Sequence, residues 1–142
     1  MDILDLVFVI WAFFLQIVLI VHFAIRKRFL NTYTLKIGWI VYALGIPAAM
    51  ISVVQMFGGK SWEFWTGGLL FASFGLFGVW VEYIKKIHWR KPLRISIALP
   101  YLCLYLSSIM FYWWPLGRLS LSLWLVFSLL FSLAAVLNIR SH

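Results

Sequence analysis

One acidic side chain, Glu82, lies at the end of a long apolar stretch, where an ionisable group has to be matched by a partner or a function. At about 100° per residue along a helix, it falls on the same face as Gly75. Lys85 and Lys86 follow at the spacing of ordinary helix ion pairs. Two interpretations are open: Glu82 forms a local ion pair near the membrane surface, or it contacts a proton, a cation or a substrate.

Hydroxyl groups recur along one helix face at i, i+4, i+7 and i+11, in Tyr101, Tyr105, Ser108 and Tyr112. Gln16 adds a polar group near the middle of the first apolar run. Small-molecule sites combine apolar walls with a few placed polar groups. We therefore name five candidate residues for binding a lipid, a quinone or another amphiphile: Gln16, Glu82, Tyr101, Tyr105 and Ser108. Hydrogen bonding between helices is the competing interpretation, because a buried hydroxyl needs a partner with or without a ligand.

Two histidines, His22 and His88, are expected on one side of the membrane, where a pair could hold a haem in an electron-transfer subunit. Neither belongs to a recognisable ligand spacing, so both are interpreted as interfacial unless haem is found. The single Cys103 excludes an intrachain disulfide and a CxxC site. The sequence also lacks the HExxH, Gly-x-Ser-x-Gly and Walker motifs of metalloproteases, hydrolases and nucleotide-hydrolysing proteins. We predict no metal and no cofactor.

The composition places these groups in a membrane protein. Of the 142 residues, 65% are hydrophobic and 11% are charged, whereas soluble domains have about 45–50% and 25%. Five apolar runs of roughly membrane-spanning length leave no room for a soluble domain; they cover residues 3–25, 37–57, 64–84, 95–114 and 119–139. We predict an all-α integral membrane protein in which residues 1–142 form one domain, a compact bundle of five transmembrane helices.

The basic residues predict the orientation, because Lys and Arg in short loops stay on the cytoplasmic side. With the N-terminus outside, Lys60 and Arg118 face outward, and the other ten of the twelve Lys and Arg face inward. We expect a multi-pass protein of the cytoplasmic (inner) membrane with a cytoplasmic C-terminus. The net charge of +8 is then expected to meet anionic lipid headgroups at the inner face rather than nucleic acid.

Small residues predict how the helices pack, since membrane helices associate where small side chains allow close approach. The third run has Gly68, Ala72 and Gly75 on one face, with Gly78 at its margin. The second run offers Gly45, Ala49 and Ser52, and the fifth offers Ser128, Ser132 and Ala135. We expect the third helix to be central and to contact the second and fifth helices.

Local signals predict bends and ends of helices. Pro47 and Pro100 are expected to free the carbonyls of Ala43 and Ser96, and so to bend the second and fourth helices. After the turn Gly58–Gly59, the Ser61 hydroxyl is expected to cap the third helix, and Glu63 to complement its dipole. Residues 115–118 are expected to connect the fourth and fifth helices.

Minimal loops, packing stripes and the lack of an assembled catalytic set favour a non-enzymatic anchor or accessory subunit of a larger membrane complex. Its partners would be other membrane subunits or copies of itself. The alternative is a small transporter or binding protein for a lipidic or amphiphilic ligand, such as a bound lipid or quinone. A haem-binding electron carrier is the third candidate.

Overall fold

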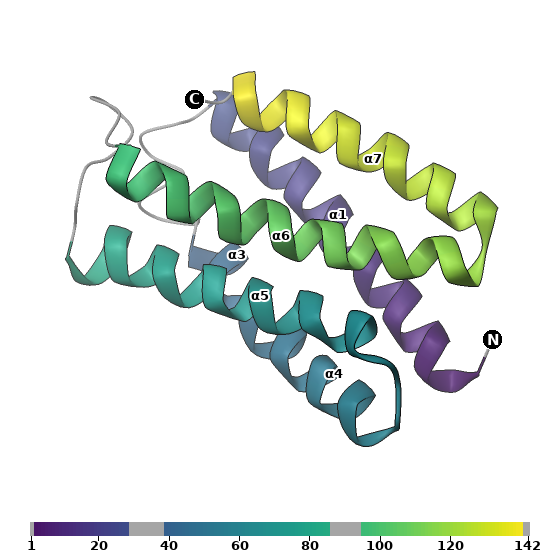
Figure 1. Ribbon diagram of the computed structural model, residues 1–142. Coiled ribbons are helices and arrows are strands. Elements are labelled where there is room, and N and C mark those ends of the chain that lie inside the picture. The colour runs from purple at the N-terminus through teal and green to yellow at the C-terminus, as the bar shows by residue number, and fades with distance from the viewer. Residues whose placement is uncertain (1, 29–38, 86–94, 141–142) are drawn as a thin grey trace. The chain divides into compact units, whose positions relative to one another are not determined.

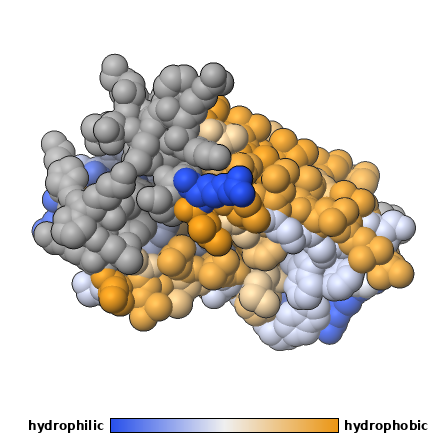
Figure 2. All heavy atoms as spheres, turned by 90° about the horizontal axis from the view of Figure 1, so that it is seen from above, coloured by the Kyte–Doolittle hydropathy of each residue, from blue (hydrophilic) through white to orange (hydrophobic). Residues whose placement is uncertain are grey.

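The computed structural model describes residues 2–28, 39–85 and 95–140 (Figure 1). These residues are 93% helical and contain no strand. Five helices in this part of the chain are long and apolar enough to cross a membrane: Ile3–Ile25, Trp39–Phe57, Trp62–Ile84, Ile95–Leu119 and Leu121–Arg140. The prediction of an all-α chain with five such helices is confirmed. Figure 2 shows a mainly hydrophobic surface over the described residues in that view.

The helical elements are α1 (Ile3–Arg28), α3 (Trp39–Ala43), α4 (Gly45–Phe57), α5 (Trp62–Val79), the π-helical turn η1 (Trp80–Ile84), α6 (Ile95–Leu119) and α7 (Leu121–Arg140). The predicted connection at residues 115–118 is wrong, because α6 continues through Pro115 and Gly117 to Leu119. A proline inside a helix removes one backbone hydrogen bond, and here Pro115 and Leu116 are fully buried, so packing of their side chains favours the continued helix.

The chain packs as two compact units, described separately here. Unit one consists of Met1–Val41 and Tyr112–His142, and unit two consists of Tyr42–Phe111. Helix α6 therefore contributes residues to both. The expected contact between the third and fifth helices joins α5 of unit two to α7 of unit one, and it stays a prediction.

In unit one, α7 packs along α1 (Figure 1). The rings of Phe13 and Phe127 meet edge to face with centroids 5.6 Å apart. Phe127 and Ala134 are the buried residues of α7, whereas Ser132 of the expected small-residue stripe is exposed and donates to the Ser128 carbonyl of its own helix. The buried contact surface of α7 is thus formed by the Phe127 ring and the Ala134 methyl group.

In unit two, α4 and α5 form an antiparallel hairpin (Figure 1). Its tight turn contains Gly59 at φ +80°, a conformation that glycine adopts without steric cost. Ser61 is the N-cap residue of α5, but its hydroxyl makes no capping hydrogen bond, contrary to expectation. Its carbonyl accepts from the Phe64 amide at 3.0 Å instead. Glu63 lies in the first turn, as predicted.

The second apolar segment is interrupted at Leu44, between α3 and α4. The interruption falls three residues before Pro47, which cannot donate a backbone hydrogen bond to the preceding turn. The helix resumes with the Ala48 amide bonded to the Leu44 carbonyl at 3.1 Å. The helix is therefore interrupted near Pro47 and next to Tyr42, and the predicted bend stays a prediction.

Candidate functional site

Two glycines of α5 make room for Tyr42 in unit two. A Cβ atom built on Gly75 would lie 2.6 Å from the Tyr42 carbonyl oxygen. A Cβ atom on Gly78 would collide with the Tyr42 ring itself. Backbones approach this closely only where small residues allow it, so Gly75 and Gly78 position the ring of Tyr42 against the end of α5.

The Tyr42 hydroxyl joins two other elements. It donates to Glu82 Oε2 of η1 at 2.5 Å, and its oxygen lies 3.0 Å from the hydroxyl of Tyr101 on α6. We call Tyr42, Glu82 and Tyr101 the tyrosine–glutamate cluster. All three belong to unit two, so the cluster is a cross-helix polar group within one packed unit.

The direction of these hydrogen bonds follows from counting protons. A tyrosine hydroxyl has one proton to donate, and Tyr42 gives its proton to Glu82. Tyr101 must therefore be the donor in the contact between the two hydroxyls. The two contacts together form a hydrogen-bond chain that runs from Tyr101 through Tyr42 to Glu82.

Aromatic rings surround the cluster. The ring of Phe74 lies 4.9 Å from that of Tyr101 and 5.7 Å from those of Tyr42 and Tyr105, measured between centroids. Tyr83 approaches Tyr42 edge-on at 6.3 Å. Apolar walls around a few oriented oxygens are the usual composition of a small-ligand site.

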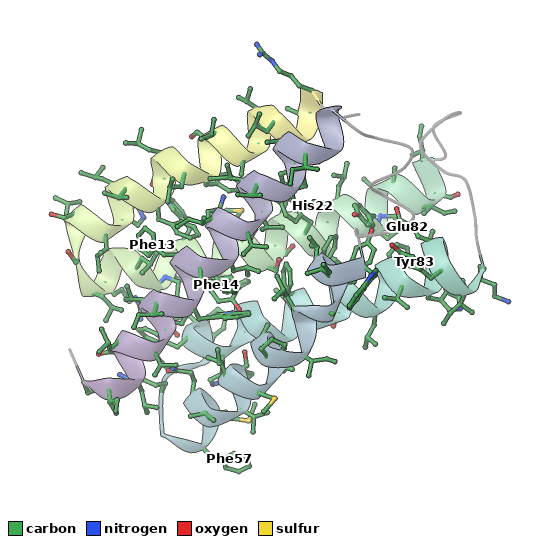
Figure 3. The ribbon with its side chains drawn as sticks, turned by 180° about the vertical axis from the view of Figure 1, so that it is seen from behind. Phe13, Phe14, His22, Phe57, Glu82 and Tyr83 are labelled. Carbon is green, nitrogen blue, oxygen red and sulfur yellow. The ribbon has the colours of Figure 1, made fainter. Side chains whose placement is uncertain are left out.

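Glu82 is placed by the π-helical turn η1, in which the Lys85 amide bonds the Trp80 carbonyl at 2.8 Å. Such turns occur frequently at functional sites because they redirect side chains relative to a regular helix. Glu82 is half-buried and Lys85 is exposed. Figure 3 shows Glu82 beside Tyr83 at this end of the α5–η1 helix. Lys86, the other expected ion-pair partner, lies outside the described residues, so the local ion pair stays a prediction.

Of the remaining candidate residues, Tyr105 lies beside the cluster, with its ring 5.7 Å from that of Phe74. Tyr105 and Ser108 are buried on α6, and the Ser108 hydroxyl donates to the Tyr105 carbonyl of its own helix at 2.7 Å. Tyr112 belongs to unit one, where its hydroxyl accepts from Trp11 Nε1 at 2.9 Å. Gln16 is also in unit one and donates to the Leu130 carbonyl at 3.3 Å. The predicted stripe of hydroxyls is thus divided between two units.

Gly68 of α5 and Gly45 of α4 lie in the seam between these two helices. A Cβ atom on Gly68 would lie 2.5 Å from the Ala48 carbonyl oxygen and would collide with the Ser52 hydroxyl. A Cβ atom on Gly45 would lie 3.1 Å from the Ala72 Cα. Ala48 is fully buried, whereas Ala49 is half-buried. The buried stripe of α4 therefore passes through Ala48, one position earlier than the expected Ala49.

No metal or haem geometry is formed by the described residues. His22 is buried on α1 with its ring 5.4 Å from that of Phe23, and His88 lies outside the described residues. No group of three or more histidine, cysteine or acidic side chains could hold a metal ion within the described part of the chain. The free Cys103 is exposed.

Tyr42 is the residue that the sequence interpretation missed. It precedes Gly45 by three positions and so continues the small-residue stripe of the second segment. That stripe marks the helix face directed at α5, and a tyrosine on such a face requires a hydroxyl partner. Glu82, on the corresponding face of the third segment, was the available acceptor.

Over the described residues, fold and site define a small all-helical protein with five helices of membrane-spanning length and a cross-helix tyrosine–glutamate cluster. No protein-family model matches the sequence, and searches of curated proteins and of solved structures found no significant match. The function must therefore be inferred from the geometry of this chain.

Proposed function

We propose that the chain is a non-enzymatic membrane protein that binds or transports a small amphiphilic ligand at the tyrosine–glutamate cluster. The observation that carries the proposal is the chain of hydrogen bonds from Tyr101 through Tyr42 to Glu82, which connects three helical segments among aromatic rings. An ionisable group within an apolar helix suggests function by default. This geometry favours the ligand-binding alternative over the anchor as the first candidate.

Native mass spectrometry of the purified protein tests this proposal. We expect the wild-type chain to retain a small amphiphile and Tyr101→Phe to lose it, because the change removes a hydroxyl and leaves the ring. Tyr112→Phe is the matched control, since Tyr112 is equally a buried tyrosine of α6 with a bonded hydroxyl but lies in unit one. Equal retention by both variants would contradict the proposal, as would a wild-type protein without any bound amphiphile.

The five helices are proposed to cross the cytoplasmic membrane with the N-terminus outside and the C-terminus cytoplasmic. The support is the distribution of the twelve Lys and Arg residues, ten of them on the proposed inner side. In a Cys103→Ser background, a membrane-impermeant maleimide added to intact cells should label Lys60→Cys and leave Lys91→Cys unlabelled until lysis. Equal labelling of the two positions would refute this orientation.

The second candidate function is an accessory subunit of a membrane complex. The small number of buried residues on α7 favours it. Only Phe127 and Ala134 of this helix are buried, and Leu129 is 73% exposed. Membrane helices associate through packing rather than through a hydrophobic driving force, so a helix with so small a seam has surface available for another protein. Anionic lipid headgroups would contact the part of the proposed cytoplasmic side that no partner protein covers.

Photo-crosslinking in the native membrane separates a partner from lipid. A photoreactive residue replacing Leu129 on α7 should give one discrete protein adduct if α7 binds a partner. The same residue replacing Leu76 on α5, which is 74% exposed, is the control for a lipid-facing position. Lipid adducts at both positions would refute the subunit hypothesis, and an adduct with a second copy of the chain would identify a homo-oligomer.

A further inference from the structure

We propose that unit two conducts protons along α5, between Glu63 at one end of this helical segment and Glu82 at the other. The segment from Glu63 to Glu82 is about 28 Å long, which is close to the hydrocarbon thickness of about 30 Å. The inference rests on the proposed insertion into a membrane, but it requires no ligand at the tyrosine–glutamate cluster. Buried polar side chains that accompany α5 from one carboxyl group to the other support it.

The first carboxyl group lies inside the α4–α5 hairpin. Glu63 is 2% exposed, and acidic residues are rarely buried to this extent. Ser52 and Gln55 of α4 are also buried, and a Cβ atom on Gly68 of α5 would collide with the Ser52 hydroxyl. A carboxyl, an amide and a hydroxyl group are therefore buried in the half of the hairpin next to its turn. Ionisable groups buried within membrane helices often mark ion or proton pathways.

Hydroxyl groups of α6 continue this row along the middle of α5. A Cβ atom on Gly67 would lie 3.2 Å from the Ser108 carbonyl oxygen, so Ser108 lies beside α5 one turn beyond the first carboxyl group. The Ser108 hydroxyl donates to the Tyr105 carbonyl at 2.7 Å. The ring of Phe74 contacts those of Tyr105 and Tyr101, with centroids 5.7 and 4.9 Å apart. Polar groups thus occur at successive levels of α5 on the side that faces α6.

The row ends in the hydrogen-bond chain of the tyrosine–glutamate cluster. The hydroxyls of Tyr101 and Tyr42 are 3.0 Å apart, and Tyr42 donates to Glu82 at 2.5 Å. A hydroxyl group both donates and accepts, so its oxygen can release one proton as it takes up another. After Glu82 loses its own proton to water, it can take the Tyr42 proton, and Tyr42 can take that of Tyr101.

The net step moves one proton, which enters at Glu63 as another leaves at Glu82. Every O–H bond that breaks along the row is replaced, so no co-reactant is needed, and movement in the opposite sense uses the same groups. A bound water molecule or a rotating side chain carries the proton wherever two polar groups lie farther apart than a hydrogen bond. Lys60 and Lys85 lie three positions outside the two carboxyl groups, and lysine head groups stay near water, so both ends of the row lie near a membrane surface.

Proton flux into vesicles tests this inference. The full-length protein is reconstituted into phospholipid vesicles that contain a pH-sensitive dye and potassium, and valinomycin in a potassium-free buffer sets an inside-negative potential. We expect the interior to acidify faster than in protein-free vesicles. Glu63→Gln and Glu82→Gln should each reduce the rate to that of protein-free vesicles, because glutamine keeps the shape of the side chain but cannot exchange a carboxyl proton.

Matched variants control for the loss of a charge and of a hydroxyl group. Asp2→Asn also removes one carboxyl group, but in unit one, where asparagine can replace the hydrogen bond to the Asp5 amide. Tyr42→Phe should slow the flux, whereas Tyr112→Phe, which removes a bonded hydroxyl of unit one, should leave it unchanged. Thermal unfolding shows which variants keep the fold; if one glutamate variant does not, the other and Tyr42→Phe decide.

Acidification of wild-type vesicles no faster than that of protein-free vesicles overturns the inference, and so does wild-type flux in a folded variant of either glutamate. An amphiphile retained on purification without proton flux overturns this inference and leaves the proposed ligand binding intact. Proton flux without a retained amphiphile supports this inference and contradicts the ligand-binding proposal. If neither is observed, both proposals fall.

Discussion

Replacing Gly75 by alanine should separate α5 from Tyr42. The added Cβ atom would lie 2.6 Å from the Tyr42 carbonyl oxygen, whereas ordinary contact begins at 3.4 Å. The two segments must therefore move apart by about 0.8 Å, and a gap of that size forfeits about a quarter to a half of each van der Waals contact. Overpacking of this kind costs about 1–3 kcal/mol, and the helix propensity of alanine returns at most about 1 kcal/mol. Taking the middle of each range, about 2 and about 0.5 kcal/mol, we expect a net loss of about 1.5 kcal/mol.

Gly45→Ala provides a graded comparison, because its Cβ atom would lie 3.1 Å from the Ala72 Cα and needs a shift of only about 0.3 Å. Ser73→Ala is the surface control, since Ser73 is exposed on α5. The free energy of unfolding of each variant in detergent, followed by tryptophan fluorescence, should fall in the order Ser73→Ala, Gly45→Ala, Gly75→Ala. A Gly75→Ala protein as stable as the wild type, or more stable than Gly45→Ala, would refute the close-packed seam.

Two further predictions concern unit one. Trp113→Phe and Ser128→Ala should each lower the free energy of unfolding by about 0.5–1.5 kcal/mol, because Trp113 Nε1 donates to Ser128 Oγ at 2.7 Å. The double variant should cost less than the sum, since both changes remove the same hydrogen bond; strict additivity would contradict this. Gln16→Leu should stay within about 1 kcal/mol of the wild type, because Gln16 Oε1 is buried with no hydrogen-bond partner within the described chain. A loss above about 2 kcal/mol in thermal unfolding would show that Gln16 has an essential partner.

Hydropathy predicted the number and approximate positions of the helices because membrane-spanning length is a bulk property of a segment. The first segment begins and ends where expected, and the third and fourth differ mainly at one end each. Pro115 misled the prediction of the fourth, because its helix-breaking tendency was weighed without the burial of Pro115 and Leu116 in the folded chain. The division into two units was not foreseen, since periodicity within a helix does not specify which helices share a core.

The candidate site was predictable only in part, because the sequence does not specify which helices pack together. Glu82 and Tyr101 were identified because each stands out within its own helix, one by charge and the other by the spacing of hydroxyls. Their connection runs through Tyr42, which has no chemical peculiarity and becomes decisive only because Gly75 and Gly78 admit it. A sequence pattern indicates which side chains share one face of a helix. A hydrogen-bond chain across three segments also depends on how those helix faces pack against one another.

The hydrogen bonds made by Tyr42 also explain how the Glu82 carboxylate can lie among aromatic rings in unit two. A carboxylate near apolar rings is costly unless it is hydrogen-bonded, and Tyr42 supplies that bond only by giving up its single proton. Tyr101 then satisfies Tyr42 and commits its own proton in turn. The hydrogen-bond chain from Tyr101 through Tyr42 therefore stabilises the Glu82 side chain among the aromatic rings of unit two.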